Sequence, residues 1–437
     1  MPQSDVLLTL LGFGMVATFM VLIMLKKLTP IVALTVVPLA FALVAGFGSE
    51  ALGEMMLKGI GVLAPTGVML MFAILYFGIM IDAGLFDPAV KAILRMVGGD
   101  PLKIVVGTAI LSATVSLDGD GSTTYMITVA SMLPLYRRLG LNVLKLTCVT
   151  ILAGGIMNLT PWGGPLARAA SALHVEPANI FVPMIPVLVC GLVGVFAVAY
   201  YLGLGERRRL GVVALEVVFF DEVPAESDGL KRPKLLWVNF ALTLALMTGL
   251  VLRIAPLPVL FLVGFCIALI INYPGIAQQR QRIAVHGQNV VAVVSVIFAA
   301  GVFTGILTGT GMVDAMSKSL LAVIPQSWGP YLAPITALAS LPFTFFISND
   351  AFYFGVLPIV SSAAQTYGIS GVEMARAALI GQPVHLLSPL VPSTYLLVGL
   401  AGVEFGDHQR FTLPWAILMC LVMLAAALML GIFPFSA

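Results

Sequence analysis

Charged residues are scarce in this chain, in which lysine, arginine, aspartate and glutamate together make up 10% of 437 residues. Soluble globular domains carry about a quarter. Hydrophobic residues reach 60%, and the mean hydropathy is +1.08. There is too little polar surface to cover a water-soluble protein of this size, and the net charge of +2 gives no basis for nucleic-acid binding. Apolar runs of about 20 residues, the length of a bilayer-spanning helix, recur along the chain and predict an integral membrane protein.

Cysteine is rare as well, and its placement argues against a metal centre. No two cysteines have the spacing of metal ligands, so we expect packed thiols and no covalent cofactor. The N-terminal stretch MPQSDVLLTL has neither a basic start nor a small-residue cleavage site. We therefore expect it to begin the first membrane span and not a signal peptide. The four cysteines, each within an apolar run, are Cys148, Cys190, Cys266 and Cys420.

The fold class that these runs predict is an all-α membrane protein with ten spans. Two further apolar stretches, 101–136 and 330–366, are each interrupted by a central polar cluster and are predicted as re-entrant hairpins. Irregular backbone is not tolerated against lipid, but it is tolerated where it lines a cavity inside the protein. The ten predicted spans are about 5–25, 28–47, 62–82, 142–166, 179–203, 235–253, 256–273, 288–309, 372–393 and 412–434.

The basic residues predict the orientation of the chain. With the N-terminus outside, 17 of the 22 lysines and arginines fall in inner loops, as the positive-inside rule requires. A full span at either hairpin would move later basic clusters to the outer side, so both hairpins are predicted to turn back. Both termini are then outside. The basic residues left outside or within the membrane are Lys58, Arg168, Arg253, Lys318 and Arg376.

The two halves of the chain match at a nearly constant offset of 227–228 residues, as in Pro30 and Pro258. Each half has five spans, an odd number, so the second half is predicted to be inverted. Inverted repeats with broken helices at the midplane are typical of secondary transporters. Each half also has an amphipathic segment, DPAVKAILRMVGG or DAMSKSLLAVIPQ, predicted as a helix on the membrane surface. The predicted units are a first repeat at 1–205, a cytoplasmic linker at 206–234 and a second repeat at 235–437.

Four polar clusters break the apolar pattern, one in each hairpin and one in each broken helix, about 142–166 and 372–393. Glycine and proline end a helix where its backbone donors are free, and the N-terminus of a helix binds carboxylates well. Serine, threonine and asparagine add neutral hydrogen bonds. The clusters predict a site for a small polyanion, formed by Ser122, Thr123, Thr124, Asn158, Thr160, Gly163, Gly164, Ser348, Asn349, Ser388, Ser393 and Thr394.

Three aspartates lie in the hairpin tips, within LDGDGSTT and ISND. An ionisable group at the centre of a membrane-embedded element costs at least ~2.5–3.5 kcal/mol on insertion scales, which makes it a functional candidate. We predict that these side chains bind a proton or a hard divalent cation. The alternative for the first two is a turn-capping role, because Asp-Gly favours turns. The three are Asp118, Asp120 and Asp350.

Other ionisable residues leave two interpretations open. His385 is the only histidine within a predicted span and is a candidate proton carrier; a packed, hydrogen-bonded histidine is the alternative. Arg168 is expected either to bind a carboxylate bidentately or to snorkel to the outer interface. Asp82 and Glu404 lie near the ends of spans and are expected to be structural.

The segments FAILYFGIMIDAGLFDP, GDPLKIVVGTAILSATVSLDGDGSTT and NLTPWGGPLARAA resemble the citrate–metal–proton symporter family (CitMHS) of the ion transporter superfamily. The resemblance covers nearly the whole chain and is most specific in residues 60–175. It implies a bacterial inner-membrane carrier, not an enzyme, that takes up citrate complexed with a divalent cation of the Mg²⁺ or Ca²⁺ type, driven by protons. It also implies a homodimer embedded in membrane lipid, in which a mobile domain moves elevator-fashion against a static scaffold.

The superfamily's sodium-coupled dicarboxylate carriers bind carboxylate with Ser-Asn-Thr at both hairpin tips. Those positions match Ser122-Thr123-Thr124 and Ser348-Asn349-Asp350 in this sequence. The acidic residues here depart from that pattern, and the departure fits a proton or a metal better than sodium.

Several alternatives remain open on the residues alone. A related carrier would take another di- or tricarboxylate, or iron–citrate. An intramembrane aspartyl protease would use Asp118 or Asp120 with Asp350, but Leu117-Asp118-Gly119-Asp120 lacks the first glycine of the Gly-x-Gly-Asp motif. A channel is the third alternative, and the predicted inverted hairpins favour a gated site over an open pore.

Overall fold

The computed structural model describes residues 5–437 except 26, 98, 120, 213–228 and 324, and these described residues contain helices and no strand. The helices before the linker are α1 (Asp5–Met24), α2 (Pro30–Val44), α3 (Ser49–Asp82), α4 (Asp87–Val97), α5 (Pro101–Val115), the 3-10 turn η1 (Ser116–Asp118), α6 (Gly121–Leu139), α7 (Val143–Met157), α8 (Gly164–Ala172) and α9 (Pro177–Leu210). Those after it are the 3-10 turn η2 (Pro233–Leu235), α10 (Leu236–Val251), α11 (Leu257–Asn272), α12 (Ile276–Gly309), α13 (Met312–Val323), the 3-10 turn η3 (Gln326–Tyr331), α14 (Leu332–Phe346), the π-helix η4 (Ala351–Val356), α15 (Leu357–Gln365), α16 (Gly371–Ala378), α17 (Gln382–His385), α18 (Pro392–Ala401) and α19 (Phe405–Met429).

Seven helices in the described part of the chain are long and apolar enough to cross a membrane: α1, α3, α5 with η1, α9, η2 with α10, α12 and α19. An all-helical membrane protein is thus confirmed. Six of the seven were predicted as spans, and the seventh, α5 with η1, was predicted as the first arm of a hairpin. The predicted spans at 28–47, 142–166 and 256–273 correspond to the shorter apolar helices α2, α7 and α11.

The ends of several helices differ from the prediction. The spans predicted at 62–82 and 288–309 are the C-terminal parts of α3 and α12, which are each 34 residues long. Their first turns carry polar residues such as Glu50 and Gln279, which fall outside an apolar window. The segment predicted at 372–393 is split into three short helices, α16, α17 and the start of α18, because glycine and proline interrupt it repeatedly.

The two 34-residue helices cross at glycines. A Cβ atom on Gly59 of α3 would collide with the carbonyl oxygen of Gly301 in α12, and one on Gly301 would lie 2.9 Å from the carbonyl oxygen of Gly59. One turn on, a Cβ on Gly305 would collide with the carbonyl oxygen of Met55. Lipid offers helices no hydrophobic drive to associate, so close backbone approach at small residues supplies van der Waals contact instead. The Gly301–Gly305 pair therefore fixes how α3 and α12 pack.

The first predicted hairpin is formed by α5, η1 and α6, and polar contacts join its two arms. Thr108 Oγ1 lies 3.3 Å from the Tyr136 hydroxyl, Ser112 Oγ lies 3.3 Å from Thr128 Oγ1, and Ser116 Oγ lies 3.2 Å from Thr124 Oγ1. Thr108 and Ser112 of α5 and Ser116 of η1 are four residues apart, so they form one stripe along this arm. All six are buried. Hydrogen bonds between helices of this kind stabilise packing in an apolar environment.

The second predicted hairpin is formed by α14, η4 and α15. Its turn is short, because α14 ends at Phe346 and η4 begins at Ala351. Ile347 leaves the helix with an extended backbone, and Ser348 Oγ accepts a hydrogen bond of 3.1 Å from the Ala351 N–H. That bond satisfies one of the donors left free where a helix begins.

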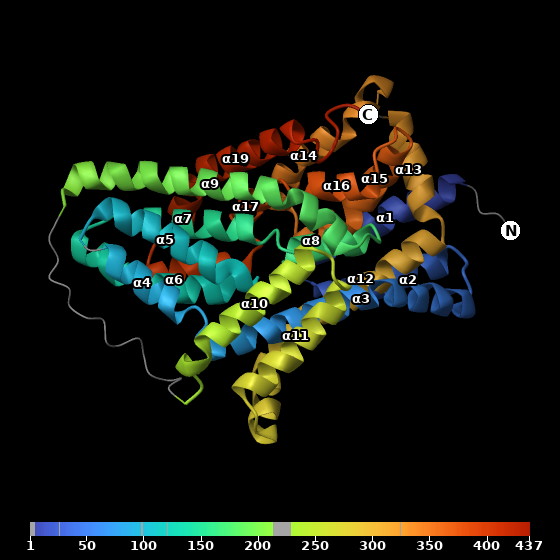
Figure 1. The fold of residues 1–437 in the computed structure, drawn as a ribbon. Helices are drawn as coiled ribbons and strands as arrows, with labels where there is room; N and C mark the ends of the chain where they lie inside the picture. The colour runs from blue at the N-terminus through green and yellow to red at the C-terminus, as the bar shows by residue number, and fades with distance from the viewer. Residues whose placement is uncertain (1–4, 26, 98, 120, 213–228, 324) are drawn as a thin grey trace.

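In space the helices form two groups (Figure 1). α3 packs against α11 and α12, and α2 and α10 extend this group. The other group includes α5, α7, α9 and α19, with the α6–α18 pair beside them. α8 and η1 contact α3, and α8 also contacts α12, so the polar tips lie where the groups meet. α19 ends at the side of the molecule where α1 begins, while α9 ends at the opposite side with Arg207, Arg208 and Arg209.

Candidate functional site

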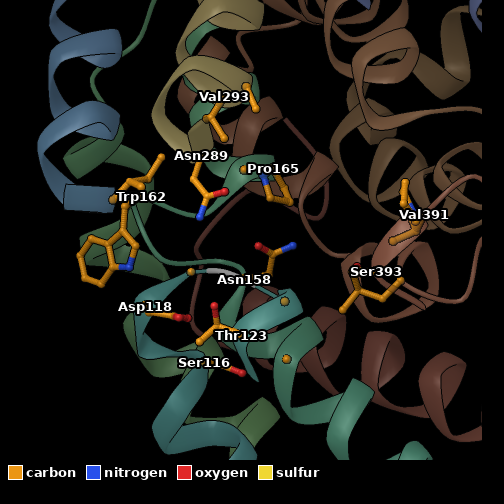
Figure 2. A pocket seen from close by; sticks show the side chains of 18 of the residues that line it. Ser116, Asp118, Thr123, Asn158, Trp162, Pro165, Asn289, Val293, Val391 and Ser393 are labelled. Carbon is orange, nitrogen blue, oxygen red and sulfur yellow. The ribbon is translucent and has the colours of Figure 1, made fainter. Parts of the chain in front are cut away.

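A cavity of about 510 Å³ lies between the α3–α12 pair and the polar tips. All four polar clusters contribute to its lining, as Figure 2 shows for Asp118, Thr123, Asn158 and Ser393. The fold thus brings together, from both halves of the chain, the polar clusters that the sequence pattern indicated. The predicted site residues that line the cavity are Asp118, Thr123, Asn158, Gly164, Ser348, Asn349, Asp350, His385 and Ser393.

The other predicted site residues lie close by without lining it. Thr160, Ser388 and Thr394 are buried, and Thr394 Oγ1 donates to the carbonyl oxygen of Leu386. Ser388 Oγ accepts a bond of 3.2 Å from the Leu390 N–H, so it caps the broken segment. The remaining three are Ser122 and Thr124 at the start of α6, and Gly163, the N-cap of α8. Asp120 lies outside the described residues.

Four helices begin at the cavity. The first residues of α6 and α8, Gly121 and Gly164, line it, and so do Asp350 before η4 and Pro392 of α18. A helix N-terminus presents unpaired N–H groups and partial positive charge. Four of them around one cavity form an anion-binding environment that needs few full charges.

Arg168 and Asp350 form an ion pair across the cavity wall. Arg168 Nε lies 2.6 Å from Asp350 Oδ1, so Arg168 contacts a carboxylate as one of its two expectations has it, but through one nitrogen and one oxygen and not bidentately. Gly164 leaves room for the guanidinium in this position, because a Cβ there would lie 2.7 Å from Arg168 Nη1. A guanidinium has five N–H donors, so bonding through Nε leaves donors for a bound anion.

The tip of the first hairpin is fixed by Trp162. Its Nε1 donates a hydrogen bond of 2.9 Å to the carbonyl oxygen of Leu117. Gly119 has a φ of +78°, and a Cβ there would lie 2.8 Å from Trp162 Cδ1. Only glycine meets both conditions without strain. The neighbouring Asp118 is buried, and its carboxyl group is directed toward Thr123 (Figure 2).

The tip of the second hairpin is tied to α17 by an amide. Gln382 Nε2 donates a hydrogen bond of 2.7 Å to the Tyr353 hydroxyl and another of 3.4 Å to Asn349 Oδ1. His385 Nδ1 lies 2.7 Å from the carbonyl oxygen of Thr344. A carbonyl only accepts, so Nδ1 carries the proton and Nε2 is the nitrogen that can gain one. His385 is thus buried and hydrogen-bonded, as one of the two expectations for this residue has it, and it also lines the cavity.

One wall of the cavity was missed by sequence reasoning. Residues of α12, among them His286 and Asn289, line it, and Figure 2 shows the Asn289 amide directed into the cavity. The predicted span began at residue 288, which left His286 in a loop. Asp82, expected to be structural, lies 2.8 Å from His286 Nε2 through Oδ2. A predicted helix extended by two residues toward its N-terminus would have included His286.

No group of three or more histidine, cysteine or acidic side chains in the described part of the chain is arranged to hold a metal ion. Asp118 and Asp350 line the same cavity, but Asp350 is paired with Arg168. Among the described residues of these two hairpin tips, Asp118 is therefore the aspartate not engaged in an ion pair with Arg168.

Long apolar helices, broken elements and a buried polar cavity between two helix groups define a multi-pass membrane transporter. The family model described as CitMHS, citrate transporter, matches residues 6–381. The chain belongs to this citrate transporter family. It is a transporter and not an enzyme, so the intramembrane protease alternative is wrong.

Three relatives from Bacillus subtilis (strain 168) are similar over nearly their whole length. A protein named citrate transporter is 57% identical over 98% of this chain and 100% of its own. A Mg(2+)/citrate complex secondary transporter is 57% identical over 97% of this chain and 99% of its own. An uncharacterized transporter, YraO, is 49% identical over 97% and 99%.

Two solved transporters share the fold at low sequence identity. The YdaH transporter of Alcanivorax borkumensis aligns with a TM-score of 0.55 at 14% identity, over 89% of this chain and 90% of its own. MtrF of Neisseria gonorrhoeae, from a class of antimetabolite efflux pumps, aligns with a TM-score of 0.57 at 17% identity, over 85% and 82%. These likenesses support the helical transporter fold and nothing about the substrate.

Proposed function

We propose that this protein is a secondary transporter that carries citrate complexed with a divalent metal ion, of the Mg²⁺ type, across the bacterial inner membrane in symport with protons. The observation that carries the proposal is the cavity in which four helix N-termini meet an Arg168–Asp350 pair and the carboxyl group of Asp118. A relative that is 57% identical is named a Mg(2+)/citrate complex secondary transporter. The composition of the cavity suits that cargo.

The anionic part of the cargo is matched by hydrogen-bond donors, of which only Arg168 carries a full charge. Free citrate carries three carboxylates, and a bound divalent cation leaves a single net negative charge. Helix N-termini, Arg168 and the side chains of Thr123, Asn158 and Ser348 supply hydrogen bonds to such an anion. Asp350 offsets the charge of Arg168, so the cavity does not favour the bare trianion.

The metal part of the cargo accounts for a carboxylate in an anion site. Asp118 is buried and lines the cavity, where it would repel uncomplexed citrate. A hard divalent cation in the complex turns that repulsion into attraction, because such cations take oxygen ligands. We assign Asp118 to the metal face of the cargo and Asp350 to holding Arg168.

Proton coupling is assigned to the remaining titratable groups of the tips. His385 has one ring nitrogen committed to Thr344 and lines the cavity with the rest of the ring. Asp120 is a candidate from the sequence motif LDGDG alone. Protonation of a carboxylate or of imidazole at the cavity changes the charge that the loaded site carries, which is the requirement for symport.

The halves of the chain are proposed to be inverted repeats that move elevator-fashion within a homodimer. The helix bounds support the repeat, since α3 begins at Ser49 and α12 at Ile276, 227 residues apart and equal in length. The glycines with positive φ agree as well: Gly84 matches Gly311, and Gly140 matches Gly368. The linker, the elevator motion and the dimer rest on the resemblance and on this correspondence.

The test is uptake of labelled citrate into proteoliposomes under an imposed pH gradient, inside acidic or inside alkaline, with Mg²⁺ or with a chelator. Uptake should require both the cation and an inwardly directed proton gradient. Equal uptake with chelator would contradict the metal complex, and equal uptake without a gradient would contradict proton coupling. Competition by other di- and tricarboxylates, and by iron–citrate, tests the alternative cargoes, and trans-stimulation by preloaded citrate distinguishes a carrier from a channel.

A further inference from the structure

The α3–α12 wall of the cavity has two polar side chains that the proposed function does not use. The residues of α12 that line it are His286, Asn289, Ala292 and Val293. His286 and Asn289 are three residues apart, so they lie on one face of the helix. They face the tips from the opposite helix group, and His286 is the titratable one.

The ring of His286 occupies a recess that Gly78 leaves open. A Cβ on Gly78 would lie 2.6 Å from His286 Nδ1 and 2.7 Å from its Cγ. Real Cβ atoms do not come this close to a ring, so an alanine at position 78 must displace the imidazole. Gly78 lies within α3, four residues before its end at Asp82, and glycine inside a helix is otherwise unfavourable by roughly 0.5–1 kcal/mol relative to alanine. The recess is a reason for glycine at this position.

The other ring nitrogen of His286 is held by a carboxylate. Nε2 lies 2.8 Å from Asp82 Oδ2, and Arg282 Nη1 donates a hydrogen bond of 3.2 Å to the same oxygen. The side chains of Asp82 and His286 are each 16% exposed, so water competes little for the contact. A carboxylate accepts from Nε2 whether or not Nδ1 is protonated, so Asp82 holds the ring at the cavity in both charge states.

We propose that His286 is a further determinant of substrate affinity: in its protonated form it places a positive charge on the α3–α12 wall that attracts the carboxylates of the bound complex. Asp82 and Gly78 are positioning residues that hold the ring there. This inference rests on the proposed function, since it concerns the same anionic cargo. Histidine changes charge between about pH 5 and pH 8, so the contribution of His286 to affinity grows as pH falls.

Other charged and titratable groups line the same cavity or contact His286 directly. Asp118, Arg168, Asp350 and His385 line the cavity across from His286, and citrate itself gains protons at low pH. A comparison of two proteins at the same pH removes all contributions that they share. The groups to consider are Asp82, Arg282, Asp118, Tyr125, Arg168, Asp350 and His385.

The experiment measures the Kd of Mg²⁺–citrate by calorimetry on the full-length protein in lipid nanodiscs, at about pH 5.5 and about pH 8, on either side of the range in which histidine titrates. The variants are His286→Gln and Gly78→Ala. Their matched controls are His174→Asn, a histidine at a positive φ of 55° that asparagine tolerates, and Gly61→Ala, where an added Cβ meets nothing within 4 Å.

The expected result is that His286→Gln weakens binding at least about fivefold at the lower pH, the size of a charge interaction across several Å in a partly screened site. At the higher pH the two proteins should differ by less than about twofold. Gly78→Ala should show the same pattern, smaller in size, and both controls should match the unmodified protein.

If the ratio of the Kd of His286→Gln to the Kd of the unmodified protein is the same at both pH values, the role of His286 is overturned. The proposed function still stands in that case, provided that the unmodified protein binds Mg²⁺–citrate. Failure of the unmodified protein to bind Mg²⁺–citrate would overturn the proposed function and this inference with it. If His286→Gln does not fold, Gly78→Ala decides, because it keeps the histidine and displaces its ring; an unchanged pH dependence there also overturns the inference.

Discussion

Arg168 of α8 and Asp350 at the start of η4 are 182 residues apart in the sequence and form an ion pair of 2.6 Å between Nε and Oδ1. The pair joins the broken helix of the first half of the chain to the hairpin tip of the second half. The side chains are 23% and 11% exposed, so the pair is largely withdrawn from water. Each partner therefore depends on the other to stabilise its charge away from water.

Removing one member of the Arg168–Asp350 pair should lower the stability of the protein more than removing both. Arg168→Gln leaves Asp350 without its cation, and loss of one member of a buried pair costs about 3–5 kcal/mol. Asp350→Asn should cost a similar amount. The double variant should recover much of the stability but none of the citrate uptake, because the guanidinium is also the cargo's donor. Thermal unfolding in detergent and uptake assays measure the two properties; additive stability losses would contradict a direct coupling.

Asp118→Asn should change the cation requirement of binding. The substitution removes a negative charge from the cavity while keeping the shape of the side chain and an oxygen acceptor. Citrate without metal should then bind several-fold better than it does to the unmodified protein, and the benefit of added Mg²⁺ should shrink. Titration of citrate with and without chelator, followed by thermal shift, tests this. An unaltered dependence on Mg²⁺ would assign Asp118 to the turn.

Trp162→Phe should loosen the first hairpin tip. The indole N–H donates to the carbonyl oxygen of Leu117, and phenylalanine keeps the packing against Phe77 and Phe261 but has no donor. A buried carbonyl left without its partner costs about 1–3 kcal/mol. We expect a lower unfolding temperature and weaker citrate affinity together. Trp237→Phe is the control, because Trp237 is 77% exposed and far from the tip in sequence.

Gly301→Val should separate α3 from α12. The added side chain would press on the backbone of Gly59, where a Cβ already lies 2.9 Å from the carbonyl oxygen. Backbone cannot rotate away as a side chain can, so overpacking should cost at least about 1–3 kcal/mol. Gly287→Val, in the same helix with nothing within 4 Å of its Cβ, should stay near the unmodified protein. Equal unfolding temperatures for the two variants would show that the helices cross elsewhere.

Several features of the site followed from the sequence because they are local. The polar clusters LDGDGSTT, TPWGGP and ISND interrupt apolar runs, and such interruptions are only tolerated where backbone lines a cavity. Five residues of these clusters and of the second broken helix were expected at the site and line the cavity: Asp118, Thr123, Asn158, Asn349 and His385. The charge pattern and the repeat offset were likewise readable from the chain alone.

Other features depended on which surfaces meet. The contribution of Asn289 and His286 was hidden, because the polar start of α12 resembles a loop before an apolar span, and local pattern does not show which face of the helix lines the cavity. The partner of Arg168 was hidden as well: a carboxylate anywhere in the chain, or the membrane interface, was compatible with its position. Long-range pairing is not recorded in local pattern or spacing.

The sequence by itself determined that this is a membrane protein. It also determined at which positions the helices break and which polar residues lie at those breaks. The reason is that burying polar groups in lipid is costly, which leaves a strong local signature in the sequence. Only the tertiary structure decided that four helix N-termini point at one cavity, that Asp350 holds Arg168, and that Gly78 makes room for His286 beside Asp82. Those contacts join residues from distant parts of the chain, and their energies exist only once the helices have packed.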